Sequence, residues 1–171
     1  MKIINRLLVS CITVSLIIVA AGCGTVTHSE PGTTTTIILT RHSDRDPLAE
    51  DLNDKGRLRA EALVEAVGDM NISAIYSPDM KRNLETAKPL AKHLGIKVQV
   101  LGPSKNEVTT AILTRNPGEV VIWIGNSHNL KGIYSLLGGE GAPPINYGDL
   151  YIVEVQDSGD PVVTKKRYGP P

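Results

Sequence analysis

The chain has 171 residues, of which 41% are hydrophobic and 21% charged, values that are ordinary for globular proteins and suit one domain rather than two. Lys plus Arg and Asp plus Glu each number 18, so the formal net charge is zero and no basic block indicates a nucleic-acid partner. Aromatic residues make up only 4% of the chain, so the core must be built from Ile, Val, Leu and Ala.

The first residues, 1–22, are predicted to form a secretion signal rather than part of the fold. Lys2 and Arg6 make a basic start, and a nearly uninterrupted apolar run then extends to Ala21. A membrane-spanning helix needs about 20 apolar residues, more than this run provides before glycine and polar residues close it. The sequence therefore predicts an exported protein.

Cys23 is the predicted site of lipid attachment. The end of the apolar run, Ala20-Ala21-Gly22-Cys23, resembles the bacterial lipobox, in which the Cys becomes the lipidated first residue of the mature protein. Cys11 would leave with the signal, so Cys23 would be the only thiol and no internal disulfide could form. A multiply acylated cysteine would hold the protein at the bacterial cell envelope, on its periplasmic or outer surface, without a spanning helix. Plain secretion is the alternative.

Small and polar residues over 23–33 predict a flexible tether, and the folded domain is predicted over 34–171. The β-branched run 36–39 predicts a buried first strand, and the apolar spacing of 54–70 predicts the helix that follows it. Further strands are predicted over 72–76, 97–101, 120–124, 151–155 and 162–167, and further helices over 80–94, 107–114 and 130–137.

The order of these elements predicts an α/β fold. Strands that alternate with helices favour a largely parallel sheet with helices on both faces, because parallel neighbours need a crossover connection. The last two strands are separated only by residues 156–161, so we expect them to be antiparallel at one edge. The prediction is a three-layer α/β/α sandwich.

Charged and polar residues follow three of the predicted strands, at the edge where ligands collect in an open α/β sheet. They are Arg41, His42 and Arg45 after the first strand, Ser77 and Arg82 after the second, and Asn126, Ser127 and His128 after the fourth. Guanidinium forks bind the nonbridging oxygens of a phosphoryl group without a metal, and a neutral imidazole is a nucleophile toward phosphorus. We therefore expect a phosphate site with no metal and no cofactor, since the four histidines lack metal-ligand spacing.

The motifs at these positions resemble those of the histidine phosphatase superfamily, in order and spacing, from about residue 35 to residue 137. They are Thr40-Arg41-His42-Ser43, Leu52-Asn53-Asp54-Lys55-Gly56, Tyr76-Ser77-Pro78 with Arg82, and Ser127-His128-Asn129. The resemblance implies a phosphoglycerate mutase-like fold, phosphate binding by Arg41 and a phosphohistidine formed on His42. It also implies that Arg82 and His128 complete the phosphate pocket. In size the chain is similar to the small phosphohistidine phosphatases.

Two positions depart from the family's pattern. Ser43 stands where the family usually has Gly, and Asn129 stands where the acid phosphatase branch has an Asp proton donor. The same branch places a further phosphate-binding Arg where Arg45 stands. Glu107 lies about as far beyond Arg82 as the acidic residue of the mutase-like branch lies beyond its Arg, so Glu107 is the predicted general acid.

The predicted activity is hydrolysis of a phosphomonoester or a phosphohistidine, with a small phosphorylated substrate and, through the lipid, a membrane as partners. A phosphomutase would need an enclosing lid, for which the chain offers little sequence. The alternative from another class is a lipid-anchored binding protein that holds phosphate-bearing ligands without turning them over. The missing Asp after His128 keeps this alternative open.

Overall fold

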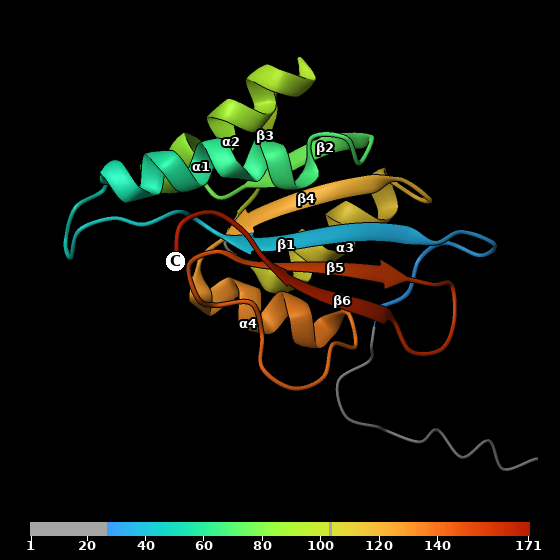
Figure 1. Ribbon diagram of the computed structural model, residues 1–171. Helices are drawn as coiled ribbons and strands as arrows, with labels where there is room; N and C mark the ends of the chain where they lie inside the picture. The colour runs from blue at the N-terminus through green and yellow to red at the C-terminus, as the bar shows by residue number, and fades with distance from the viewer. Residues whose placement is uncertain (1–26, 103) are drawn as a thin grey trace, which may run out of the picture.

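The computed structural model describes residues 27–102 and 104–171 (Figure 1). The predicted signal, residues 1–22, and the predicted lipid site Cys23 lie outside these residues. In the described part of the chain, no helix combines the length and the apolar character that a membrane crossing requires.

One mixed sheet of six strands forms the centre of the described chain, in the order β3-β2-β4-β1-β5-β6. The strands are β1 (Thr35–Arg41), β2 (Ile72–Ser77), β3 (Val98–Val100), β4 (Val120–Gly125), β5 (Asp149–Val155) and β6 (Val162–Arg167). β1 to β4 run parallel, whereas β5 runs antiparallel to both of its neighbours, β1 and β6. The predicted parallel sheet with an antiparallel edge is therefore confirmed.

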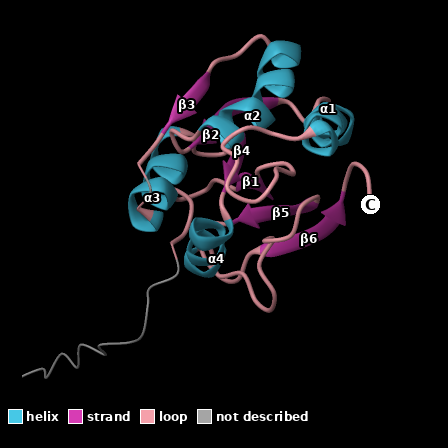
Figure 2. Cartoon of the chain, turned by 90° about the vertical axis from the view of Figure 1, so that its left-hand side faces the viewer, coloured by secondary structure: helices cyan, strands magenta, loops and turns pink. Residues whose placement is uncertain are grey.

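Helices cover both faces of this sheet, which confirms the predicted three-layer sandwich (Figures 1 and 2). In the described residues the helices are α1 (Asp54–Val67), α2 (Lys81–Leu94), α3 (Lys105–Arg115) and α4 (Ser127–Leu136). α1 and α2 pack side by side on one face, and α3 and α4 pack on the other.

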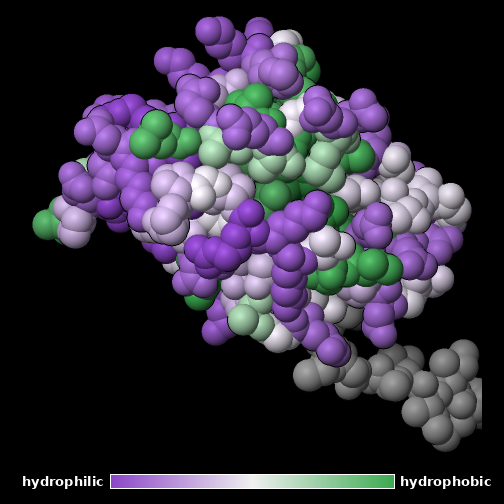
Figure 3. Space-filling model, viewed as in Figure 1, coloured by the Kyte–Doolittle hydropathy of each residue, from purple (hydrophilic) through white to green (hydrophobic). Residues whose placement is uncertain are grey.

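Alternate residues of the central strands point to the two faces of the sheet. Ile38 and Ile122 lie in the core beneath α1 and α2, and Leu39 and Trp123 lie in the core beneath α3 and α4. All four side chains are fully buried. Because helices cover both faces, the strands are continuous apolar runs rather than alternating ones. On the face shown in Figure 3, hydrophilic residues surround patches of hydrophobic residues.

Two helices begin earlier than their apolar spacing predicts, because polar residues form the first turn. α3 begins at Lys105 rather than at residue 107, and Ser104 precedes it as the capping residue. α4 begins at Ser127 rather than at residue 130. Apolar periodicity marks only the buried turns of a helix, so it places the start of a helix with an exposed first turn too late.

The predicted flexible tether does not extend over residues 27–33, because this segment is hydrogen-bonded to the domain. Ser29 is 6% exposed, and its Oγ donates to the carbonyl of Val155 at 2.7 Å. The backbone N–H of Ser29 donates to the carbonyl of Gln156 at 3.0 Å. A buried hydroxyl needs a partner, and the end of β5 supplies it. The rest of the predicted tether, 23–26, lies outside the described residues.

Candidate active site

The carboxyl ends of β2, β4 and β1 lie next to one another, and the residues that follow these strands form the candidate site. In the register of the sheet, Arg41 pairs with Gly125 and Tyr76 pairs with Trp123. The backbone N–H of His42 donates to the carbonyl of Gly125 at 2.9 Å. The topology therefore fixes the loop after β1 against the turn between β4 and α4, at the edge where α/β sheets bind ligands.

His42 is held in one orientation at the start of the loop after β1. The residue is 3% exposed, and its Nδ1 lies 2.8 Å from the carbonyl oxygen of Ser43. A carbonyl oxygen can only accept, so Nδ1 carries the proton and donates it. In the neutral ring this leaves the lone pair on Nε2, which is the nitrogen available for nucleophilic attack.

The pKa of His42 is lowered from 6.5 to about 4. Burial is the largest cause, because an imidazolium ion loses its hydration there, and the hydrogen bond to the Ser43 carbonyl opposes the shift. The positive charges of Arg41, Arg82 and Arg45 lower the pKa further. The charges of the three predicted arginines thus act on a ring that is neutral at pH 7.

This shift can be measured directly by nitrogen NMR of the histidine rings. On acidification, we expect the His42 ring to stay neutral until about pH 4. The folded pKa lies below that of the unfolded chain, about 6.5, so protons bind the unfolded chain first and the free energy of unfolding falls between these two pH values. A His42 ring that titrates near 6.5 in the folded protein would contradict the described environment.

Arg41 is positioned by the segment that precedes β5. Its Nη1 donates to the carbonyl of Ile145 at 3.0 Å, and its guanidinium carbon lies 4.1 Å from the centre of the Tyr147 ring. The same ring meets His42 edge to face, with 5.7 Å between the ring centres. Cation–π stacking holds a guanidinium in place without neutralising its charge. Sequence reasoning missed Tyr147, because no local pattern marks it.

Arg82 lies in the first turn of α2, where it is 9% exposed. Its Nη1 lies 2.9 Å from Oε2 of Glu50, a residue of the loop between β1 and α1 that sequence reasoning also missed. Thr86, one turn further along α2, donates its Oγ1 proton to the Arg82 carbonyl and accepts from the N–H of Ser43, both at 2.8 Å. These hydrogen bonds link α2 to the loop that carries His42.

Arg45 lies in the loop between β1 and α1 and donates to backbone carbonyls of the same loop. Its Nη1 lies 2.7 Å from the carbonyl oxygen of Ala49 and 3.2 Å from that of Asp46. Within the described residues, no ion pair joins Arg45 to the carboxylate of Asp44 or Asp46. The guanidinium therefore keeps a net positive charge near His42.

The Nε atoms of Arg41, Arg45 and Arg82 are buried, and none of them has a hydrogen-bond partner among the described residues. Buried donors are almost always paired in proteins. The oxygens of a tetrahedral anion would pair guanidinium donors of this kind. The chemistry of these side chains therefore fits a phosphoryl group.

A buried ion pair supports the loop after β1 from the side of α1. Arg59 is 2% exposed, and its Nε donates to Oδ2 of Asp44 at 2.6 Å. Its other nitrogens donate to the carbonyls of Tyr168 at 2.7 Å and Pro170 at 2.6 Å. Gly56 packs so tightly that a Cβ there would lie 2.0 Å from the Asp44 carbonyl oxygen. Close contact between α1 and this loop thus fixes the position of Asp44, two residues after His42.

The turn between β4 and α4 carries His128 and Asn129. His128 is the second residue of α4 and is exposed, so its predicted hydrogen bond to a bound phosphate stays a prediction. Asn129 is buried, and its Oδ1 accepts from the backbone N–H of Asn126 at 2.8 Å. Asn129 therefore stabilises the start of α4.

Glu107, the predicted general acid, lies in the first turn of α3 and is exposed. Its backbone N–H donates to Oγ of Ser104 at 3.5 Å. A carboxylate in this position also stabilises a helix through the helix dipole. The catalytic role of Glu107 stays a prediction.

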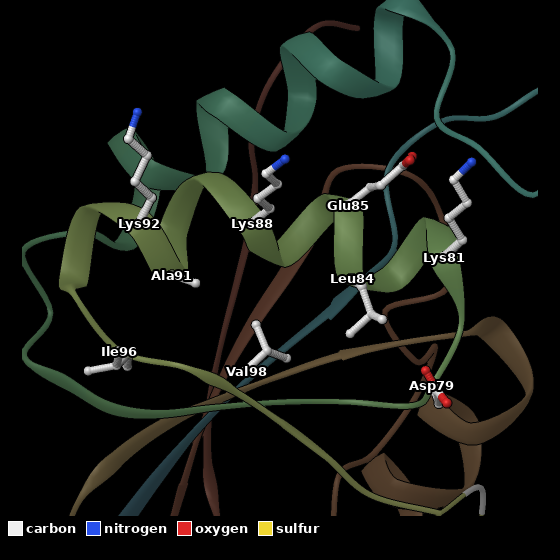
Figure 4. A pocket seen from close by; sticks show the side chains of 9 residues that line it. All are labelled: Asp79, Lys81, Leu84, Glu85, Lys88, Ala91, Lys92, Ile96 and Val98. Carbon is white, nitrogen blue, oxygen red and sulfur yellow. The ribbon is translucent and has the colours of Figure 1, made fainter.

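One cavity lies close to the candidate site, and a larger one lies away from it. A cavity of about 370 Å³ opens at the ends of β2 and β4, where Met80 and Asn126 line it. A cavity of about 660 Å³ lies between α2 and β3, with Leu84 and Val98 among its lining residues, and none of the predicted site residues lines it (Figure 4). In the described part of the chain, no group of three or more His, Cys, Asp or Glu side chains is placed to hold a metal ion.

Comparison with known proteins identifies this architecture. Residues 30–102 match the family model of the histidine phosphatase superfamily, branch 1. The structure of YhfR from Bacillus stearothermophilus superposes with a TM-score of 0.61 and 21% sequence identity, over 76% of this chain and 95% of that one. This is the histidine phosphatase fold. The phosphoglycerate mutase-like fold that the sequence motifs implied is thereby confirmed.

Other solved structures share the histidine phosphatase fold. The protein histidine phosphatase SixA, complexed with tungstate, has a TM-score of 0.61 and 14% identity, over 77% of this chain and 96% of SixA. A mycobacterial glucosyl-3-phosphoglycerate phosphatase, in complex with inorganic phosphate, has a TM-score of 0.58 and 14% identity, over 79% of this chain and 97% of that one. No curated protein sequence matches the chain significantly.

Proposed function

We propose that the chain is a phosphatase of the histidine phosphatase type, which hydrolyses a phosphomonoester or a phosphohistidine through a phosphohistidine intermediate on His42. The observation that supports this most is the buried, neutral imidazole of His42, with its lone pair on Nε2, beside three guanidinium groups. Neutral imidazole is a competent nucleophile, and guanidinium groups stabilise the charge that develops on a transferring phosphoryl group.

The geometry supports a reaction in two halves. In the first, Nε2 of His42 forms a bond to phosphorus as the bond from phosphorus to the leaving group breaks. In the second, a water oxygen attacks phosphorus and the bond to Nε2 breaks, which returns the neutral ring. Arg41, Arg45 and Arg82 would hold the nonbridging oxygens throughout, and Tyr147 would keep the Arg41 guanidinium in position.

The proposed substrate is a small phosphorylated molecule or a phosphohistidine. Two solved structures of the same fold are named as a protein histidine phosphatase and a glucosyl-3-phosphoglycerate phosphatase. A phosphoramidate is a suitable substrate class for this chain. Its P–N bond is reactive, so cleavage of that bond depends less on proton donation by a general acid.

We also propose that the mature protein is anchored by lipid at Cys23 to the bacterial cell envelope, on the strength of the sequence over residues 1–23. An exported phosphatase would meet envelope sugars, lipid phosphates and scavenged esters rather than cytoplasmic glycolytic intermediates. The described domain would then work at a membrane surface without a spanning helix of its own.

The proposal is tested by trapping the intermediate. The purified protein is mixed with p-nitrophenyl phosphate, quenched in alkali, which preserves phosphohistidine, and analysed by peptide mass spectrometry. We expect release of p-nitrophenol and a phosphate on the peptide that contains His42. Release without phosphate on that peptide would contradict the proposed nucleophile.

A non-catalytic binding protein for phosphate-bearing ligands is the second candidate. It is favoured by one observation, that the side chain of Asn129, where a related branch has an acid, is used to stabilise the start of α4. Binding of phosphate with no release of p-nitrophenol above the buffer rate would support this candidate.

A further inference from the structure

Glu50 is the acidic residue that contacts the candidate phosphate site. Its Oε2 lies 2.9 Å from Nη1 of Arg82, whose side chain is 11% exposed, while the side chain of Glu50 is 65% exposed. Arg82 is thus held by the fold, and Glu50 reaches it from the solvent side. The Glu50 carboxylate therefore pairs with the Arg82 guanidinium, the group that we assign to phosphate binding.

The loop between β1 and α1 holds Glu50 over the start of α2. Directly after it, Asp51 forms an ion pair with Lys81 at 2.6 Å, and the backbone N–H of Leu52 donates to Oε2 of Glu85 at 2.9 Å. Lys81 and Glu85 extend from the outer side of α2 (Figure 4). These contacts do not involve the Glu50 side chain, so Glu50 can leave Arg82 and stay near it.

The other acidic positions are less well placed for this task. The amide of Asn129 cannot give up a proton, and it is already bonded within the turn before α4. In the described part of the chain, Glu107 forms no ion pair with Arg41, Arg45 or Arg82, whereas Glu50 contacts Arg82 directly. Among these candidates, Glu50 alone contacts an arginine of the proposed phosphate site.

We propose that Glu50 is the proton donor to the leaving group, an assignment that rests on the proposed phosphatase function. An incoming phosphate displaces the Glu50 carboxylate from Arg82, and repulsion between the two anions favours uptake of a proton from water by Glu50. As Nε2 of His42 bonds to phosphorus and the P–O bond breaks, Glu50 gives this proton to the departing oxygen. In the second half, the Glu50 carboxylate accepts a proton from the attacking water as the bond from phosphorus to Nε2 breaks.

The test compares the wild-type protein with Glu50→Gln on p-nitrophenyl phosphate and phenyl phosphate, through kcat/KM. This ratio reports only steps up to the first irreversible one, formation of the phosphoenzyme. Nitrophenolate leaves without a proton, so we expect Glu50→Gln to match the wild-type protein within about 3-fold on that substrate. Phenolate is far more basic, so we expect a loss of about 100-fold or more on phenyl phosphate.

Asp51→Asn is the matched control, because it removes the neighbouring carboxylate and its ion pair with Lys81. We expect Asp51→Asn to change kcat/KM by the same factor for both substrates. Gln keeps the size of Glu50 and can still accept from Arg82, so a merely structural role would not give a loss that depends on the leaving group. An equal effect of Glu50→Gln on both substrates, or a selective loss in Glu107→Gln instead, would overturn the assignment. A wild-type protein inactive on both substrates and on a phosphohistidine peptide would refute the proposed function itself.

Discussion

His42→Ala should lower kcat/KM for p-nitrophenyl phosphate by roughly 10⁴-fold or more, because it removes the atom that we propose bonds to phosphorus. The remaining arginines would still bind the anion, so we expect the affinity for inorganic phosphate to change far less than the rate. Steady-state hydrolysis and calorimetric titration with phosphate measure the two effects separately.

His93→Ala is a suitable control for this experiment, because His93 is an exposed residue of α2 that lines none of the site described above. Its activity should match that of the wild-type protein. Equal rates in the wild-type protein and in His42→Ala would show that the imidazole of His42 takes no part in hydrolysis.

Arg59→Met should lower the free energy of unfolding by about 3–5 kcal/mol, the usual cost of removing one partner of a buried ion pair. The substitution keeps much of the buried volume but leaves the Asp44 carboxylate without its closest cation. It also leaves the carbonyls of Tyr168 and Pro170 without their donor. Urea unfolding followed by circular dichroism measures this loss.

The same helix offers a matched control in Arg57→Met. Arg57 pairs with Asp54, but both side chains are exposed, at 61% and 96% of their surface. Exposed pairs contribute little, so this variant should lie within about 1 kcal/mol of the wild-type protein. Equal losses in the Arg57 and Arg59 variants would show that the pair of Asp44 with Arg59 has no special role in stability.

Much of the fold was predictable, because its elements depend on local patterns. The apolar β-branched run after Thr35 and the run that begins at Val120 are the two central strands, and buried strands need such residues on both faces. Gly95 ends α2 in a left-handed conformation with φ of 69°, as a glycine at a helix end predicts. The first residues of α3 and α4 are polar and lack such a pattern.

The candidate site was predictable only in part, for a related reason. Arg41 ends β1, His42 follows it directly, and Arg82 lies in the first turn of the helix after β2, so the topology brings all three to one edge of the sheet. Tyr147, which packs on Arg41 and His42, and Arg59, which holds Asp44 in the loop after β1, contact the site through tertiary packing. The hydrogen bond from Arg41 to the Tyr147 hydroxyl spans 106 positions of the sequence, and no local periodicity encodes a partner so distant.

The reversed direction of β5 has a consequence for how this protein can vary. Each parallel strand brings only the connection that follows it to the edge of the candidate site. The antiparallel β5 instead brings the connection that precedes it, which includes Ile145 and Tyr147. That entering connection lies before β5 and far along the chain from the loop of His42. Insertions or exchanges there would reshape the wall next to Arg41 while leaving His42 and its supporting helices untouched. If the proposed function holds, this connection is where a new preference for the group attached to phosphate could arise.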